Sequence, residues 1–318
     1  MECQSEDRGN HREGASVSIG REQLQMFGGD WTEKKLNVLA GYLNAYTTAL
    51  KNQRFTKVYI DAFAGTGYRE LKRVDQPAKP LFEEISQDDT QKFLNGSARI
   101  ALKIRNRFDQ YVFIEKSQKR AEELEKIKAE APYSDIADSI FIQCGECNAL
   151  LQKWCAEPIW NEYRAVVFLD PFGMQVEWST MEALAVTRAI DVWILFPLGM
   201  AVNRVLMSDM SKMPSAWANR LTAIFGCEDW RNLFYRESET NTIFENVEKS
   251  IKKSCTLEQI GDYYHQRLKE IFPSVADNPA ILKNSTGSPL FQLHFAAANS
   301  GLGGKIALKI AEHLLKGI

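Results

Sequence analysis

Acidic residues follow three short apolar runs of the sequence, at Asp61, Glu115 and Asp170. A carboxylate can bind an ammonium group, and it can accept hydrogen bonds from both hydroxyls of a ribose. In parallel α/β sheets, ligands bind outside the carboxyl ends of the strands. Acids at three such ends are therefore candidates for holding a cofactor that carries both kinds of group.

The first of these acids begins a glycine turn, Asp61-Ala-Phe-Ala-Gly65-Thr-Gly67. Glycine lets a backbone approach a ligand closely, because no Cβ stands in the way. The turn lacks the three glycines of a dinucleotide fingerprint and the Lys-Ser/Thr of a P-loop, so phosphate binding is not expected. Either a plain turn or a site for an ammonium and ribose hydroxyls fits the pattern.

Two further acids follow the next expected strands. Glu115 is placed to accept ribose hydroxyls, although an acid at this position can also be merely solvated. Glu146, in Gly145-Glu-Cys-Asn148, could meet an adenine amino group.

The fourth expected strand ends in Asp170-Pro171-Phe172-Gly173. Proline fixes the local backbone and leaves the preceding carbonyl free to accept. Asp170 and that carbonyl could accept two N–H bonds from a planar amine, while Phe172 stacks on its ring. This would be catalysis by positioning. The alternative is a strand terminated by proline beside a structural aspartate.

The cysteines and histidines do not form a recognisable metal or hydrolase pattern. Cys144-x-x-Cys147 has Cys155 nearby, but no histidine lies close in sequence, and a zinc site normally needs four ligands. We expect no metal site and interpret the cysteines as buried thiols at a strand end. His294 lies inside an apolar strand, where a core imidazole is the expected role.

Strands alternating with helices predict an α/β fold with a mostly parallel sheet covered on both faces. The expected strands are 57–61, 111–115, 139–143, 165–170, 191–196, 280–283 and 290–297. Helices are expected from about Thr32 to Leu50, over 98–107, 117–130 and 180–188, and from Gly303-Gly304 to about Lys316.

Three segments depart from this rhythm. Residues 1–30 are polar and are expected to form a mobile tail. Residues 31–318 are expected to form a single domain, with a polar insertion at 68–94 and a helical insertion at 200–272. Trp217, Trp230, Phe234 and Tyr235 are expected to form a small core of the second insertion. The longest apolar run, 192–202, is too short to cross a membrane, and no segment suggests export, so a cytoplasmic protein without membrane contact is expected.

The order of motifs resembles that of the three-Cys-motif partner proteins. The resemblance is carried by the following elements: Trp31-Thr-Glu-Lys-Lys, Tyr42-Leu, Asp61-Ala-Phe-Ala-Gly-Thr-Gly67, Gly96-Ser-Ala98, Phe113-Ile-Glu115, Gly145-Glu-Cys-Asn148, Asp170-Pro-Phe-Gly173 with Trp178, Asp191-Val-Trp-Ile-Leu-Phe-Pro197, and Phe225-Gly226 with Trp230. It extends over nearly everything after residue 30. The family is named after a phage-related protein with three cysteines that its members tend to accompany.

The resemblance implies a Rossmann-like class I methyltransferase fold, with a seven-stranded sheet ending in an antiparallel hairpin, and S-adenosylmethionine as cofactor. It further implies a role for each of the following residues. Asp61, Phe63, Ala64, Gly65 and Gly67 would hold the methionine part, Glu115 the ribose, and Glu146 with Asn148 the surroundings of the adenine. Asp170, Pro171 and Phe172 would face the methyl acceptor.

Three functions remain open at this point. A methyltransferase acting on a nitrogen of a nucleic-acid base is the first, although 39 basic against 41 acidic residues give no overall positive charge for binding nucleic acid. Methyltransferases that act on base amino groups resemble a pattern with a second proline and then an aromatic residue, where this chain has Phe172 and Gly173. A non-catalytic, cofactor-binding partner of the three-Cys-motif protein is the second. An enzyme acting on a small molecule or a protein is the third.

Overall fold

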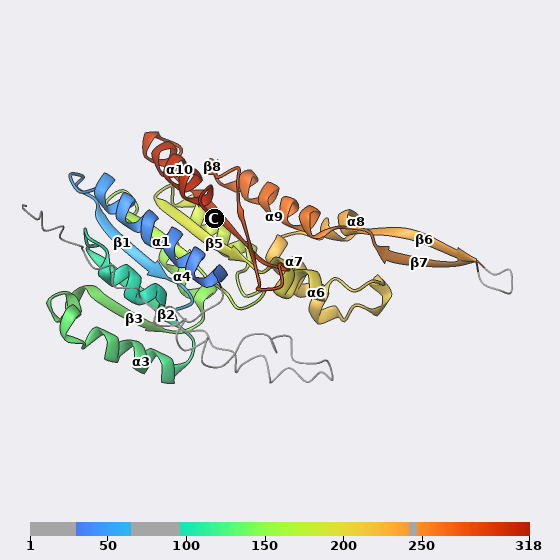
Figure 1. Ribbon diagram of the computed structural model, residues 1–318, viewed down its shortest axis with the longest axis horizontal. Coiled ribbons are helices and arrows are strands. Elements are labelled where there is room, and N and C mark those ends of the chain that lie inside the picture. The colour runs from blue at the N-terminus through green and yellow to red at the C-terminus, as the bar shows by residue number, and fades with distance from the viewer. Residues whose placement is uncertain (1–29, 65–95, 242–246) are drawn as a thin grey trace, which may run out of the picture.

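A mixed sheet of eight strands forms the centre of the protein (Figure 1). The computed structural model describes residues 30–64, 96–241 and 247–318; Gly65, Gly67 and the expected insertion at 68–94 lie outside them. The parallel strands are β1 (Thr56–Asp61), β2 (Gln110–Glu115), β3 (Ile140–Cys144), β4 (Tyr163–Leu169) and β5 (Ile190–Phe196). All seven residues of β5 are buried, as expected for a strand covered on both faces.

The strand order is β3-β2-β1-β4-β5-β10-β8, in which β10 (Pro289–Ala297) runs antiparallel to β5. The short strands β8 (Ser274–Val275) and β9 (Ala280–Lys283) both pair with β10. This order, with a reversed strand beside β5, confirms the Rossmann-like methyltransferase fold. The count is one strand higher than expected, because the two-residue β8 is too short to leave a periodic signal.

Helices cover both faces of the sheet. One face packs against α1 (Asp30–Ala49), the helix over 96–103, α3 (Gln118–Lys128), the turn of 3₁₀ helix at Ala131–Ser139, and α10 (Leu302–Leu315). The other face packs against α4 (Cys147–Cys155), α5 (Trp178–Val186), α7 (Ser215–Phe225), α8 (Trp230–Phe234) and α9 (Leu257–Ile271). The expected helices are thus present, with ends that differ by a few residues.

The segment 200–272 is not helical throughout. After the π-helical turn at Leu198–Val202 come α6 (Asn203–Val205), a 3₁₀ turn at Met210–Lys212, and α7 and α8. The chain then forms an antiparallel ribbon of β6 (Tyr235–Asn241) and β7 (Val247–Lys253), which extends away from the sheet (Figure 1). The ribbon was missed because its strands are mostly polar and therefore give no apolar alternation.

The aromatic residues of this segment are buried, but they belong to the core that covers one face of the sheet rather than to a small core of their own. Trp230, Phe234 and Tyr235 are at most 2% exposed, and Trp217 packs against the same cluster. Gly226 ends α7 with a φ of 75°, and a Cβ there would overlap the indole of Trp178. This glycine is therefore required both by its backbone conformation and by a close approach.

Within the described ranges, no helix has both the length and the apolar character needed to cross a bilayer.

Candidate functional site at the carboxyl edge of the sheet

The carboxylates of Asp61, Glu115 and Asp170 belong to one edge and one face of the sheet. Asp61 is aligned with Phe113 of β2 and with Phe168 of β4. Glu115 and Asp170 each lie two residues beyond those partners, and side chains two residues apart point to the same face. That face is the one covered by α1, and the three acids are at most 5% exposed.

The chain after Asp61 continues between its neighbouring strands. The Ala62 amide donates to the Phe168 carbonyl at 3.0 Å, and the Ala64 amide donates to the Ile114 carbonyl at 2.9 Å. Phe63 and Ala64 are 7% and 2% exposed, and the Phe63 amide approaches Asp61 Oδ1 at 3.4 Å. The backbone leading to Gly65 is therefore held at the centre of the edge.

Asp61 is a buried acid without full compensation. Its Oδ2 atom is buried and has no hydrogen-bond partner among the described residues. Burial raises the pKa of Asp61 to about 7. The polar side chain of Ser97 acts against this change and lowers the pKa, whereas the negative charge of Asp170 raises it. A cationic group beside this oxygen would stabilise the charged carboxylate.

Asp170 is paired with a lysine that the sequence reasoning missed. Lys35 Nζ donates to Asp170 Oδ2 at 2.7 Å, and the lysine side chain is completely buried. Burial raises the pKa of Asp170 and lowers that of Lys35, while the ion pair opposes both changes. At the methyl-acceptor position predicted from the sequence, Asp170 therefore forms a buried ion pair with Lys35.

Helix α1 brings Lys35 to this position. Lys35 lies four residues before Leu39 and seven before Tyr42, and these spacings place all three on one face of a helix. That face packs on the sheet, because Leu39 and Tyr42 are at most 1% exposed. Trp31 lies one turn earlier, with the Lys35 ammonium 5.1 Å from its ring centroid. A lysine within an apolar stripe was the signal that could have identified this residue.

The tip after β4 is held by a short-range contact. The Phe172 amide donates to Gln175 Oε1 at 3.0 Å, Pro171 is buried and the Phe172 side chain is half-buried. Pro171 fixes the backbone on one side of Phe172 and Gln175 on the other. The aromatic ring thus stands on a constrained turn beside Asp170.

Glu115 is oriented by the turn that follows β2. Its Oε1 atom accepts a hydrogen bond from the Ser117 amide at 2.6 Å, and its carbonyl accepts one from the Gly145 amide at 3.0 Å. The second bond connects Glu115 with the loop that carries Glu146.

Glu146 and Asn148 form a network around the start of α4. Glu146 caps this helix by accepting from the Ala149 amide at 2.9 Å, and it also accepts from Asn148 Nδ2 at 2.8 Å. Asn148 Nδ2 donates in addition to the Gln175 carbonyl at 2.8 Å, while its Oδ1 accepts from the Glu177 amide and the Thr180 hydroxyl. The Asn148 amide thus makes four bonds within the protein, which is its full capacity. It holds the loop after β4 in place.

The cysteines differ in their surroundings. Cys147 is buried, whereas Cys144 is exposed, so only one of this pair has the burial expected for both. Among the described residues, no cluster of three or more His, Cys, Asp or Glu side chains could hold a metal ion. His294 is 0% exposed, as expected for a core imidazole.

No protein-family model matches the sequence, and no curated protein matches it. Solved structures do match, at low similarity. A spermidine synthase in complex with the transition-state analogue AdoDATO is 11% identical, with a TM-score of 0.38, over 89% of this chain and 62% of that one. Spermidine synthase from Thermotoga maritima is 10% identical, with a TM-score of 0.37, over 86% and 61%.

The chain thus spans less than two thirds of the length of either spermidine synthase. A third match is a protein from Listeria monocytogenes that is provisionally assigned as an S-adenosylmethionine-dependent methyltransferase. It is 10% identical, with a TM-score of 0.33, over 80% of this chain and 98% of that one. The strand order described above, rather than these similarities, identifies the fold as that of the class I methyltransferases.

Proposed function

We propose that this protein binds S-adenosylmethionine at the carboxyl edge of its sheet and transfers the methyl group of that cofactor. The observation that carries this proposal is the buried Oδ2 atom of Asp61, which has no hydrogen-bond partner among the described residues. The ammonium of the methionine moiety is a group of the right charge to compensate it.

The other acids of this edge complete the proposed cofactor site. Glu115 would accept the ribose hydroxyls, as acids at the tip of the second strand do in related sheets. Glu146 would lie near the adenine, with Asn148 positioning the loop around it. Phe63 and Ala64, where the backbone is held between two strands, would line the methionine part. We propose the same role for Gly65 and Gly67.

For the methyl acceptor, we propose a nitrogen of a nucleic-acid base next to Asp170, Pro171 and Phe172. The support is chemical: a carboxylate and the carbonyl before a proline can accept N–H bonds, and a half-buried aromatic ring can stack on a planar base. Methyl transfer converts the sulfonium cofactor to its neutral thioether, and the acceptor nitrogen loses a proton. The Asp170 carboxylate would receive that proton or orient the nitrogen.

A second candidate is a cofactor-binding subunit that acts with a three-Cys-motif protein without being the catalyst. Lys35 favours this alternative, because its ammonium already donates to Asp170 Oδ2 and thereby takes up part of the capacity of this carboxylate to accept from a substrate. In that case the ion pair is structural, and the cofactor serves binding or regulation.

Calorimetric titration with S-adenosylmethionine and S-adenosylhomocysteine tests the cofactor site. We expect saturable binding that is lost in Asp61→Ala and retained in Glu125→Ala, a control at an exposed acid on α3. Absence of binding to the wild-type protein, or unchanged affinity in Asp61→Ala, would contradict the proposed site.

Transfer of a labelled methyl group separates the two candidates. DNA, RNA and protein are offered as acceptors to the wild-type protein and to Asp170→Asn. A catalyst loses transfer in Asp170→Asn while cofactor affinity is kept. A partner subunit shows no transfer by itself, and the activity of its complex is insensitive to this substitution.

A further inference from the structure

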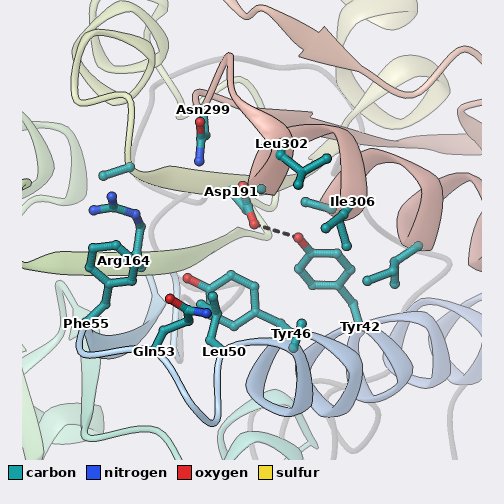
Figure 2. A pocket seen from close by; sticks show the side chains of 15 residues that line it. Tyr42, Tyr46, Leu50, Gln53, Phe55, Arg164, Asp191, Asn299, Leu302 and Ile306 are labelled. Carbon is teal, nitrogen blue, oxygen red and sulfur yellow. Dashed lines mark hydrogen bonds between the residues drawn. The ribbon is translucent and has the colours of Figure 1, made fainter.

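A cavity of about 340 Å³ opens at the opposite, amino edge of the sheet (Figure 2). Its walls come from the C-terminal half of α1, the first residues of β4 and β5, and the beginning of α10. Ligand pockets commonly measure roughly 300 to 1,000 Å³, so this cavity is large enough for a small molecule. It lies at the far ends of the strands from Asp61 and Asp170, and the inference from it does not depend on the proposed methyl transfer.

Asp191, the second residue of β5, lies at the base of this cavity and is only 7% exposed. Its Oδ2 atom accepts a hydrogen bond from the Tyr42 hydroxyl at 2.7 Å (Figure 2). Among the described residues, the Tyr42 hydroxyl is the one hydrogen-bond donor to this carboxylate, and it uses Oδ2 rather than Oδ1. Burial raises the pKa of Asp191 to about 7, while the Tyr42 bond and the charge of Arg164 lower it. The carboxylate is thus a buried acceptor with spare capacity.

The nearest cation does not neutralise Asp191 directly. Arg164 lines the same cavity, but its Nη1 atom donates to the carbonyls of Trp160 and Tyr163 at 2.7 and 2.6 Å. Its guanidinium also lies over the ring of Phe55, 3.8 Å from the centroid. Within the described part of the chain, no ion pair joins Arg164 to Asp191. Among the described residues, the Asp191 carboxylate therefore faces the cavity with a hydroxyl partner but without a paired cation.

The rest of the lining is mostly apolar. Leu50, just after α1, and Leu302 and Ile306 of α10 form the walls, and Leu302 and Ile306 are 75% and 44% exposed. Tyr46 adds a ring whose hydroxyl points into the same space (Figure 2). Exposed leucine and isoleucine side chains beside a buried carboxylate suit a ligand with an apolar body and one polar end.

We propose that this cavity binds a small molecule in which a protonated amine is attached to an aliphatic or aromatic body. The amine donates to Asp191 Oδ1, and the apolar body packs between Leu50, Leu302 and Ile306. Nothing in the cofactor site at the other edge is required for this binding.

Calorimetry with 2-phenylethylamine and its neutral analogue 2-phenylethanol tests the proposal at about pH 8, where Asp191 is largely ionised and the amine is still protonated. We expect the amine to bind the wild-type protein saturably, and the alcohol about tenfold or more weakly, because only the protonated amine can donate a hydrogen bond between opposite charges to the carboxylate. Asp191→Asn should lose the preference for the amine. Asp109→Asn, at an exposed aspartate, is the matched control and should keep it.

A second variant keeps the test valid if Asp191→Asn folds poorly. Leu302→Lys places a positive charge at the mouth of the cavity, and because this side chain is exposed, folding should be unaffected. It should weaken the amine more than the alcohol. Equal affinities of the two probes, no saturable binding of the amine, or unchanged amine binding in both variants would overturn the proposal.

Discussion

Lys35 and Asp170 are 135 positions apart in the sequence, and their side chains form a buried ion pair with an N–O distance of 2.7 Å. The pair connects the first turns of α1 to the tip after β4. It thereby fixes α1, the helix before the first strand, to the turn where methyl transfer is proposed. If either residue were replaced by an uncharged one, the charge of the other would remain buried without compensation.

Replacing Lys35 with methionine should therefore destabilise the protein by about 3–5 kcal/mol, since breaking a buried ion pair leaves one charge without compensation. Urea unfolding at neutral pH measures this loss. Lys51→Met, at an exposed lysine beyond the end of α1, is the control and should change stability by less than about 0.5 kcal/mol.

The double variant Lys35→Met with Asp170→Leu tests whether the loss of stability comes from the buried charge that the single variant leaves behind. It should recover much of the lost stability, because two apolar side chains leave no buried charge. A single variant as stable as the wild-type protein would show that the pair contributes little.

Asp61 makes a prediction for the pH dependence of stability. Its folded-state pKa of about 7 lies above its ordinary value, so the native state holds a proton that the unfolded state releases from about pH 4 upward. Its contribution to stability is therefore full at low pH and is lost as the pH rises to 7. Asp61→Asn should be more stable than the wild-type protein at pH 8, by on the order of 1–4 kcal/mol, and the difference should vanish near pH 4.

Unfolding in urea at several pH values measures this difference, with Glu125→Gln as the exposed control. A difference that does not depend on pH would contradict the assignment of a buried, protonated Asp61. Adding S-adenosylmethionine should reverse the order at pH 8, because the ligand would compensate the charge in the wild-type protein only.

His294 should make the protein sensitive to acid. Burial lowers the pKa of His294 well below its ordinary value, and the charge of His265 lowers it further. Below about pH 6.5 the unfolded chain takes up a proton that the native state excludes, so stability falls with the pH. His294→Phe should reduce this fall by about 1.4 kcal/mol per pH unit between pH 6 and 5. His313→Gln, at an exposed site on α10, should leave the slope unchanged.

Substitutions at two glycines should distinguish the effect of backbone strain from that of steric overlap. Gly226 and Gly287 both have positive φ angles, of 75° and 81°, but only at Gly226 would a Cβ meet neighbouring atoms, those of Trp178. Gly287→Ala should cost about 1–2 kcal/mol from strain alone. Gly226→Ala should cost more, because the indole of Trp178 must also move. Thermal unfolding of the two variants compares them, and equal losses would contradict the steric argument.

The sequence predicted the strands better than the contacts between them. β9 was expected at its observed limits, and the acidic ends of β1 and β2 were found because apolar runs stop at Asp61 and Glu115. The partner of Asp170 could not be found in this way. A lysine in an apolar stripe indicates a buried charge, but not which of the many acids compensates it.

The cavity at the amino edge of the sheet could not be predicted from the sequence either. It is formed where α1 and α10, the first and last described helices, pack beside each other, and local patterns do not determine such long-range neighbours. The polar ribbon of β6 and β7 was missed for a different reason: its strands pair with each other and consist mostly of polar residues, so the sequence shows no apolar alternation there.

Helix α1 contacts a buried carboxylate near each edge of the sheet, through Lys35 to Asp170 and through Tyr42 to Asp191. The two contact residues are seven positions apart, which is close to two helical turns. Inserting or deleting one residue between them would rotate one contact by about 100° relative to the other, so only one could be kept. This stretch of α1 therefore acts as a fixed spacer across the sheet, in which the number of residues is more tightly constrained than the identity of the exposed ones.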